Sequence, residues 1–528
     1  MTTFDLTAEP WLPATRLGGD HSDLSLTDLF AQAHTLRDLG AANPLTQSTL
    51  YRLLLAVLHR AYLGPGGVKA WRALWRQGRF DRTIPDYLAH YVQRFDLFSA
   101  THPFHQTPGL ATHSAPTSVS KLFHELACAN NKTLFDHTLD GSPPRLTPAE
   151  AARALVTFQS YALGGGKSAS SQIFGAHPYF GHAPLIQGAA VYIQGNNLFQ
   201  TLLLNAVYYD PSKPNYPVPR DFDQEDLPVW ERDSTRRPPG NCAPAGYLEY
   251  LTWTSRHIRL IPDQEGDDWG VSRFYMAQGE SLALAVEDPC FAFRSNKSGE
   301  SFPIKLQEER ALWRDSGSLF NFAQSSGDGA NRDHCSANIK TINQLAADLD
   351  DLPELRCAVI GLANNKAKPL LWRMEQLPLS LELLRDEAVL VYIKGGLAWV
   401  EEVGFVLREE AKRLAGDLLT AGRRKPDGKD MARFAADLGT EVLFWARLEP
   451  PFRRYLAELP LASDREERQR AWEREGIDIA QNTLRETTEN ALGYSARELR
   501  ARVMALGRFD GYTRRKLNTR QSTKETTV

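Results

Sequence analysis

The spacing of apolar residues after about residue 380 most strongly constrains how this chain can fold. In one stretch the apolar side chains recur at every third or fourth position: Val400, Val403, Leu407, Ala411, Leu414 and Leu418. A second stretch repeats the pattern: Met431, Phe434, Leu438, Val442 and Trp445. A helix with one apolar stripe and charges opposite is stable only when the stripe packs on a partner. This region therefore predicts long helices packed together.

Breaks and caps divide the region into helices. Breaks are predicted at 421–428, at Glu449–Pro451 and at Gly493. Ser463 with Glu466, and Ser495 with Glu498, have the spacing of capping boxes that begin two further helices. Four helices joined by short links predict a four-helix bundle over residues 376–528, with a polar, frayed C-terminal tail.

Residues 1–375 have a different, mixed character. Helices are predicted at Leu45–Tyr62 and Pro148–Ala162, and strands at Ala189–Gln194 and Leu282–Val286. Pro- and Gly-rich stretches separate these elements, and long loops often carry function. The predicted fold class is α+β: a large irregular mixed domain followed by the helical bundle.

Composition excludes several classes of protein. The 528 residues include 61 Lys and Arg against 64 Asp and Glu, a net charge of −3, so nucleic-acid binding requires locally concentrated positive charge. The 5 cysteines form no C-x-x-C pair, which argues against a zinc ribbon and a disulfide-rich secreted module. The N-terminus lacks signal-peptide character, and the most apolar stretch, 388–400, is too short to span a bilayer. We expect a soluble, cytoplasmic protein.

One glycine run invites an enzymatic interpretation. Gly164–Ser168 reads Gly-Gly-Gly-Lys-Ser, but a phosphate-binding loop needs Gly at position 161, which is Tyr. That loop should also follow a strand, whereas 151–162 predicts a helix. Glycines without Cβ atoms can still approach a ligand closely and offer N–H groups, and Lys167 adds charge. A plain surface turn is the alternative.

The histidines suggest a metal site only superficially. Five of them lie between residues 102 and 137: His102, His105, His113, His124 and His137. His124-Glu125 begins like a zinc-protease helix, but position 128 is Cys rather than His. Histidines in loops and caps are the favoured interpretation.

Two polar loops remain, at 129–137 and 363–368. Each contains Asn-Asn-Lys, and amides with a lysine on a tight turn can bond base edges and phosphates. Asn-Asn is also common in ordinary turns.

In their order along the chain, these segments resemble the CasA family, the large subunit of the type I-E CRISPR surveillance complex Cascade. The resemblance covers nearly the whole length and rests on these segments: Pro10–Pro13, His102-Pro103-Phe104 with Gln106, Asn130–His137, Gly164–Ser168, Leu198–Val207, Gly361–Ala367 and the four C-terminal helices.

The resemblance implies a non-catalytic protein that recognises the protospacer-adjacent motif in double-stranded DNA, starts strand separation and helps recruit a helicase-nuclease. It implies that Gly164, Gly165 and Gly166, with Lys167, approach the minor groove. Asn364, Asn365, Lys366 and Ala367 would form the DNA-reading hairpin and its wedge, and Arg273 is a positional candidate for a further motif contact. A loop near the guide RNA 5′ handle and neighbouring subunits would comprise Asn131, Lys132, Leu134, Phe135, Asp136 and His137.

The implied partners are target DNA, the guide RNA 5′ handle, the backbone, small and handle-binding Cascade subunits, and the helicase-nuclease. Two departures from the family pattern matter. Members can carry Gln where this chain has Lys366, so motif preference can differ. Some members have a clustered-cysteine loop, which is absent here, so we expect no zinc and no cofactor.

Two other functions stay open from the residues alone. One is a metal- or nucleotide-dependent hydrolase that uses the His102–His137 cluster or Gly164–Ser168. The other is a passive scaffold that makes no DNA contact, which a salt-dependent duplex-binding assay would separate from a DNA reader.

Overall fold

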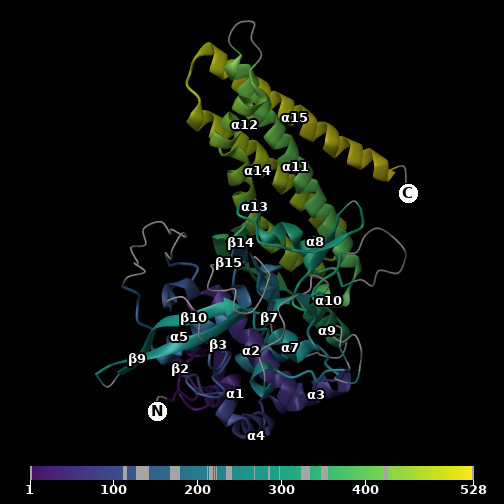
Figure 1. The fold of residues 1–528 in the computed structure, drawn as a ribbon. Helices are drawn as coiled ribbons and strands as arrows, with labels where there is room; N and C mark the ends of the chain where they lie inside the picture. The colour runs from purple at the N-terminus through teal and green to yellow at the C-terminus, as the bar shows by residue number, and fades with distance from the viewer. Residues whose placement is uncertain are drawn as a thin grey trace. The chain divides into compact units, whose positions relative to one another are not determined.

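A computed structural model describes most of the chain, in two compact units that we treat separately (Figure 1). The described residues are 3–110, 116–126, 142–166, 179–210, 212, 218, 221, 223–233, 241–266, 268–282, 286–296, 298–322, 333–346, 355–420 and 426–525. The N-terminal unit comprises Met1–Leu312 and Ser318–Leu377, and the C-terminal unit comprises Trp313–Gly317 and Pro378–Val528.

The N-terminal unit mixes helices and strands, as the sequence predicts. Its helices are α1 (Leu26–Gln32), α2 (Pro44–Tyr62), α3 (Val68–Gln77), α4 (Thr83–His90), α5 (Pro148–Tyr161), α6 (Leu198–Leu204), α7 (Tyr247–Leu251) and α9 (Ala337–Ala346). Its strands are β1 (Leu12–Arg16), β2 (His21–Leu24), β3 (Leu36–Leu39), β4 (Thr117–Ser118), β5 (Gly165–Gly166), β6 (Tyr179–Phe180), β7 (Ala190–Gln194), β8 (Asn241–Cys242), β9 (Arg256–Glu265), β10 (Asp268–Gln278), β11 (Ser281–Leu282), β12 (Phe293–Ser295), β13 (Ser301–Pro303), β14 (Leu355–Asn365) and β15 (Lys368–Leu379). The short helix α8 (Ser316–Leu319) spans the boundary between the units in the sequence.

Helix α2 is the centre of the N-terminal unit. Its apolar residues are buried almost all round, and it packs against α4, α5, α7 and β14, as expected of a core helix. Arg52 on α2 is 3% exposed, and its Nη1 lies 2.7 Å from Asp288 Oδ2. Its Nε and Nη2 donate to the carbonyl oxygens of Leu251 and Tyr250. A buried charge needs such complete pairing, and removing one partner leaves the other uncompensated.

Three-stranded sheets supply the scaffold for the loops. One has the order β15-β14-β7, with β14 antiparallel to β7, and Cys357 opposite Ile193. Another has the order β4-β10-β9, in which β9 and β10 form a long hairpin (Figure 1). The third has the order β2-β1-β3. The predicted helices at 45–62 and 148–162 and the strand at 189–194 are confirmed. Of the strand predicted at 282–286, Leu282 ends β11, and 283–285 lie outside the described residues.

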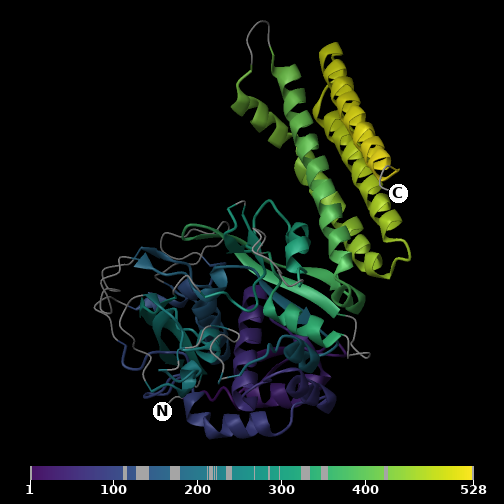
Figure 2. The same ribbon diagram turned by 90° about the vertical axis from the view of Figure 1, so that its right-hand side faces the viewer.

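The C-terminal unit is helical. Its helices are α10 (Leu381–Arg385), α11 (Ala388–Leu419), α12 (Gly428–Asp437), α13 (Thr440–Glu458), α14 (Arg465–Ala491) and α15 (Ala496–Glu525). Helix α11 packs against α12, α13, α14 and α15, and Figure 2 shows long helices of this unit running side by side. Rings of Tyr455 and Trp472 stack with centroids 5.4 Å apart in its core. The α+β fold class with a C-terminal helical region is confirmed.

Two details of the predicted helices are wrong. The apolar stripe from Met431 to Trp445 belongs to two helices, because Gly439 takes a left-handed φ of 68° and separates α12 from α13. The break predicted at Glu449–Pro451 does not occur, since Pro450 and Pro451 lie inside α13. A proline costs a helix interior about 3 kcal/mol, and burial of α13 side chains such as Phe444, Leu448 and Phe452 offsets this cost.

The helix caps are partly as predicted. The Ser495–Glu498 capping box is present: the Ser495 hydroxyl accepts from Glu498 N, and Ser495 N donates to the Glu498 carboxylate. The cap predicted at Ser463 is one residue away, where Asp464 accepts from Glu467 N at 2.9 Å, and a carboxylate suits the positive end of a helix dipole. Helix α15 continues to Glu525, well into the polar stretch where a frayed tail was expected. None of the helices in the described parts of the chain has the length and apolar character needed to cross a lipid bilayer.

Candidate nucleic-acid interface

The turn between β14 and β15 presents the predicted hairpin residues to solvent. Lys366 and Ala367 connect the two strands, and residues 365–368 are exposed. Lys366 has a φ of 55°, a left-handed conformation that non-glycine residues adopt at a cost of about 1–2 kcal/mol. The Asn364 side chain stabilises the turn by donating from Nδ2 to the Lys366 carbonyl oxygen at 2.7 Å. The buried strand β14 thus holds a rigid tip that carries a long cationic side chain.

The glycine run forms a second tight structure. Gly165 and Gly166 make up β5, which pairs antiparallel with Phe180 and Tyr179 of β6. Gly164 donates its backbone N–H to His182 Nδ1 at 3.0 Å. A methyl group in place of the Gly164 hydrogen would lie 2.8 Å from the Phe180 carbonyl oxygen, so no side chain fits there without moving the backbone. We call Gly164–Gly166 the glycine turn.

The fold brings the glycine turn and the hairpin tip together. A methyl group at Gly165 would lie 3.3 Å from Cβ of Ala367. These residues are about 200 positions apart in the sequence, and both belong to the N-terminal unit. A single ligand can therefore touch both segments at once.

A buried arginine supports the glycine turn from inside. Arg256, the first residue of β9, is 3% exposed. Its Nη2 donates to the carbonyl oxygens of Leu163 and Gly181, each at 2.9 Å, and its guanidinium carbon lies 4.7 Å from the centre of the Phe180 ring. Arg256 thus ties the residue before the glycine turn to the residue after β6. Burial lowers the pKa of Arg256 to about 9, which leaves the guanidinium charged at neutral pH.

His182 makes the glycine turn sensitive to pH. Burial, followed by the positive charges of Lys305 and Arg256, lowers the pKa of His182 below its usual 6.5. Because Nδ1 accepts from Gly164, the ring must be neutral there. The stabilising effect of this contact is therefore complete above about pH 6.5 and declines as the pH falls towards the lowered pKa.

We expect the variant His182→Asn to remove this pH dependence, because its Oδ1 can replace Nδ1 as the acceptor without titrating. Duplex binding by the wild type should weaken relative to the variant as the pH is lowered from 7.5 to the lowered pKa of His182 and below it. The measurement is the ratio of the two dissociation constants at each pH. A ratio that stays constant over a pH range in which NMR shows His182 becoming protonated would show that its protonation does not affect the turn.

The other predicted site residues are less well placed. Arg273 lies on β10, and its Nη1 donates to the Pro116 carbonyl oxygen at 3.5 Å. Gln278 of β10 lies opposite Arg256 in the strand pairing. Arg273 is five residues from Gln278 along β10, a separation of roughly 16 Å. No contact joins Arg273 to the described glycine-turn residues. Lys167 and the predicted guide loop, Asn131, Lys132, Leu134, Phe135, Asp136 and His137, lie outside the described residues.

The residues of the hydrolase alternative do not assemble a site in the described parts of the chain. No group of three or more His, Cys, Asp or Glu residues there could hold a metal ion. His105 is buried with a pKa lowered to about 3, and His124 is bonded to the Tyr161 carbonyl oxygen. His113, His137 and Ser168 lie outside the described residues. The glycines follow helix α5 rather than a strand, contrary to the requirement of a phosphate-binding loop.

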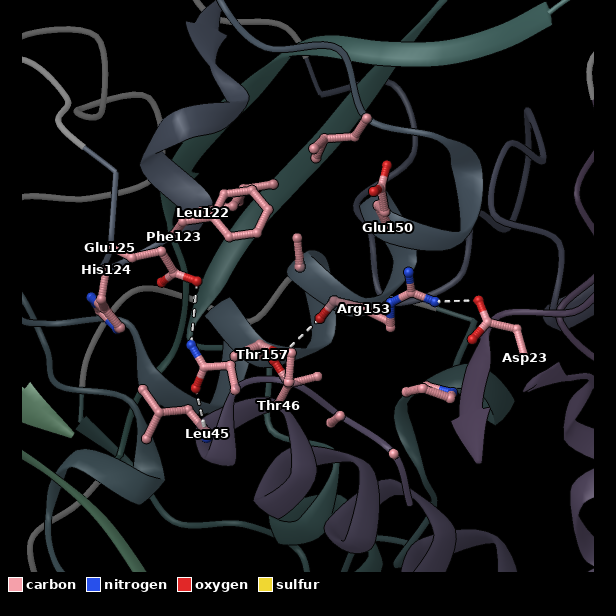
Figure 3. A pocket seen from close by; sticks show the side chains of 17 residues that line it. Asp23, Leu45, Thr46, Leu122, Phe123, His124, Glu125, Glu150, Arg153 and Thr157 are labelled. Atoms are coloured by element: carbon pink, nitrogen blue, oxygen red, sulfur yellow. Dashed lines mark hydrogen bonds and ion pairs between the residues drawn. The ribbon is translucent and has the colours of Figure 1, made fainter. Parts of the chain in front are cut away.

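A cavity of about 480 Å³ lies between the start of α2, the start of α5 and residues 122–125 (Figure 3). Its polar groups bond to one another or to the backbone. Arg153 Nη1 lies 2.9 Å from Asp23 Oδ2, and Thr157 donates to the Arg153 carbonyl oxygen. Asn43 Nδ2 donates to Glu125 Oε1 at 3.3 Å. The Arg153–Asp23 pair joins α5 to β2, and the Asn43–Glu125 bond joins the start of α2 to residues 122–125, which are structural roles.

Sequence reasoning missed three residues at the glycine turn: His182, Lys305 and Arg256. Nothing in the local sequence marks Arg256, which stands at the start of an ordinary strand. Its importance depends on contacts with residues 75 and 93 positions away. His182 follows Phe180-Gly181, and a glycine directly before a histidine was the one available signal.

Comparison with known proteins identifies the family. Residues 5–483 match the family model described as CRISPR-associated protein Cse1. The CRISPR-associated protein CasA/Cse1 of Thermus thermophilus is 32% identical over 526 residues, covering 94% of this chain and 95% of the relative.

Solved structures agree with this match. The structure of Thermus thermophilus CasA (Cse1) has a TM-score of 0.80 at 28% identity, covering 97% of this chain and 100% of that one. A chain in a structure described as a CRISPR RNA-guided surveillance complex shares the fold, with a TM-score of 0.77 at 21% identity and coverage of 96% and 100%. The resemblance stated from the sequence is confirmed: this chain belongs to the Cse1 family of CRISPR-associated proteins, also called CasA.

Proposed function

We propose that this chain is the DNA-reading, non-catalytic subunit of a CRISPR RNA-guided surveillance complex. In this function it recognises a short motif beside the target in double-stranded DNA and starts strand separation. The observation that carries the proposal is the approach of the glycine turn to the hairpin tip: only 3.3 Å separate Ala367 Cβ from the position that a methyl group at Gly165 would take. Family membership and the surveillance-complex chain of the same fold support it.

The two segments suit different parts of the task. The minor groove is about 6 Å wide, so a backbone without side chains enters it most easily. Its pattern of donors and acceptors is degenerate, which permits several related motifs. Lys366 projects from a tip beside the glycine turn, where it can enter between base steps. Unstacking a step costs roughly a few kcal/mol, and contacts along the duplex must offset that cost before guide pairing continues the opening.

The remaining partners follow from the same family assignment. We infer that residues 131–137 face the guide RNA 5′ handle and neighbouring subunits, and that the bound complex helps recruit a helicase-nuclease. Arg273 stays a candidate for a further motif contact from the hairpin of β9 and β10. The near-neutral net charge of −3 suits a protein that samples many DNA sites weakly and reads only a short motif.

The experiment is a binding comparison across duplexes with a randomised short motif, using the chain assembled with its guide complex. We expect a few related motifs to bind more tightly than the rest, and this preference to vanish when the target is already open. Equal binding to all motifs would contradict motif reading. Absence of any salt-dependent duplex binding would favour the passive scaffold.

A further inference from the structure

Arg256 carries a buried positive charge that no carboxylate balances within the described part of the chain. All hydrogen bonds of its guanidinium go to backbone carbonyl oxygens, those of Leu163, Gly181 and Ser255. Its guanidinium carbon also lies 4.7 Å from the centre of the Phe180 ring. By contrast, the equally buried Arg52 is paired with Asp288 at 2.7 Å, and the partly buried Arg232 is paired with Glu249 at 2.5 Å. An unbalanced buried charge carries a large free-energy cost, so its retention calls for an explanation.

Exposed lysines add further unbalanced charge to the same region. Lys305, Lys366 and Lys368 are exposed, and they form no ion pair with any described residue. Lys366 and Lys368 belong to the hairpin tip that touches the glycine turn. Lys305 lies close enough to His182, the partner of Gly164, to lower its pKa. Glu308 and Glu309 follow on the same segment, exposed and without an ion pair to Lys305.

The two residues next to Lys305 in the sequence fix its backbone: Ile304 through hydrogen bonds and Leu306 through packing. Ile304 accepts from Ala189 N at 2.7 Å and donates to the Ala292 carbonyl oxygen at 2.8 Å. The Cβ of Leu306 lies 3.3 Å from the position that a methyl group at Gly361 of β14 would take. The segment that carries Lys305 is therefore packed against β14, the strand that leads to the hairpin tip, and Lys305 itself is exposed between the buried residues Ile304 and Leu306.

We propose that Lys305, Arg256 and the glycine turn form a binding site for a backbone phosphate of the target DNA duplex. Lys305 contacts the phosphate directly. Arg256 is a positioning residue, because it fixes the glycine turn through Leu163 and Gly181 and adds positive potential from a poorly screened interior. The inference rests on the proposed function, and it adds a phosphate contact that fixes the register of the duplex before the motif is read.

The test is the salt dependence of duplex binding by the assembled complex. Each phosphate contact contributes a slope of about 0.9 in log Kd against log salt concentration. Lys305→Gln should lower the slope by about that amount, so that between 50 and 200 mM salt the variant loses about threefold less affinity than the wild type. Lys305→Gln should weaken binding by the same factor for every motif, because a phosphate contact carries no sequence information. Lys305→Arg should keep the wild-type slope.

The matched control is Lys69→Gln. Lys69 is an exposed lysine of α3 without an ion pair among the described residues, and α3 lies at the opposite end of this unit from β14 (Figure 1). The Lys69→Gln complex should have the same slope of log Kd against log salt concentration as the wild type. A Lys305→Gln slope equal to the wild type would overturn the phosphate site.

Arg256 is tested by Arg256→Lys and Arg256→Gln. We expect the lysine variant, which keeps a cation but not the planar guanidinium, to weaken duplex binding less than the glutamine variant does, with both checked for folding by thermal melting. A folded Arg256→Gln complex with wild-type binding would overturn the role of Arg256. If Arg256→Gln does not fold, the role of Arg256 is tested by duplex binding of the Arg256→Lys complex, and the phosphate site is tested by the salt slopes of the Lys305 variants.

The outcome for the phosphate site is separable from that for the proposed function. If the wild type does not distinguish motif-bearing duplex from other duplex, motif reading fails whatever the Lys305 variants do. If it does distinguish them and the slope is unchanged in Lys305→Gln, only the phosphate site fails. If Lys305→Gln instead loses guide RNA during assembly with an unchanged duplex slope, the phosphate belongs to the RNA and the proposal is overturned.

Discussion

Replacing Gly165 with leucine should eliminate motif-dependent duplex binding. Even a methyl group at this position would lie 3.3 Å from Ala367 Cβ, so a leucine must displace the hairpin tip or project into the space that DNA would occupy. Each base pair whose reading is lost costs about 1–3 kcal/mol, or roughly 5- to 150-fold in Kd. The measurement is the dissociation constant of the assembled complex for motif-bearing duplex.

Gly18→Leu provides the matched glycine control. Gly18 is exposed near the turn between β1 and β2, and a Cβ there would approach only Asp20, at 4.0 Å. This variant should bind duplex as the wild type does. Gly165→Leu should also still bind a target whose strands are already separated, because guide pairing then carries recognition. Unchanged motif preference in Gly165→Leu would remove the glycine turn from the mechanism.

Lys366→Ala should weaken binding to motif-bearing duplex by about tenfold or more, equivalent to about 1.4 kcal/mol. The side chain at the tip is proposed to replace stacking between base steps, and alanine is too short to do so. Binding to pre-opened target should be unchanged, since no step remains to be unstacked. The two affinities are measured side by side on the same complex.

Lys366→Gln separates the wedge from its charge. Glutamine keeps much of the length of lysine but not the charge, so a wedge role predicts that this variant retains more duplex binding than Lys366→Ala. An ionic role predicts that both variants are equally weak. Equal loss by Lys366→Ala on duplex and on pre-opened target would contradict strand separation by this residue.

The sequence alone predicted those features that arise from local periodicity. The stripe from Val400 to Leu418 has one solution, a long helix that buries its apolar face, and α11 is that helix. The periodicity of apolar residues did not predict the helix ends correctly where the conformation or packing of a single residue decided them. Gly439 ended α12 through a left-handed φ, and packing kept Pro450 inside a helix.

The candidate site divides in the same way. The glycine run and the Asn-Asn-Lys turn were visible as sequence motifs, because glycine freedom and turn-forming amides are properties of the residues themselves. Tertiary structure alone set Gly165 against Ala367, placed His182 on Gly164, and buried Arg256 against Leu163 and Gly181, with no carboxylate partner among the residues that the structure describes. Such contacts join residues from 18 to about 200 positions apart. They depend on how whole strands and helices pack, which no local pattern of side chains encodes.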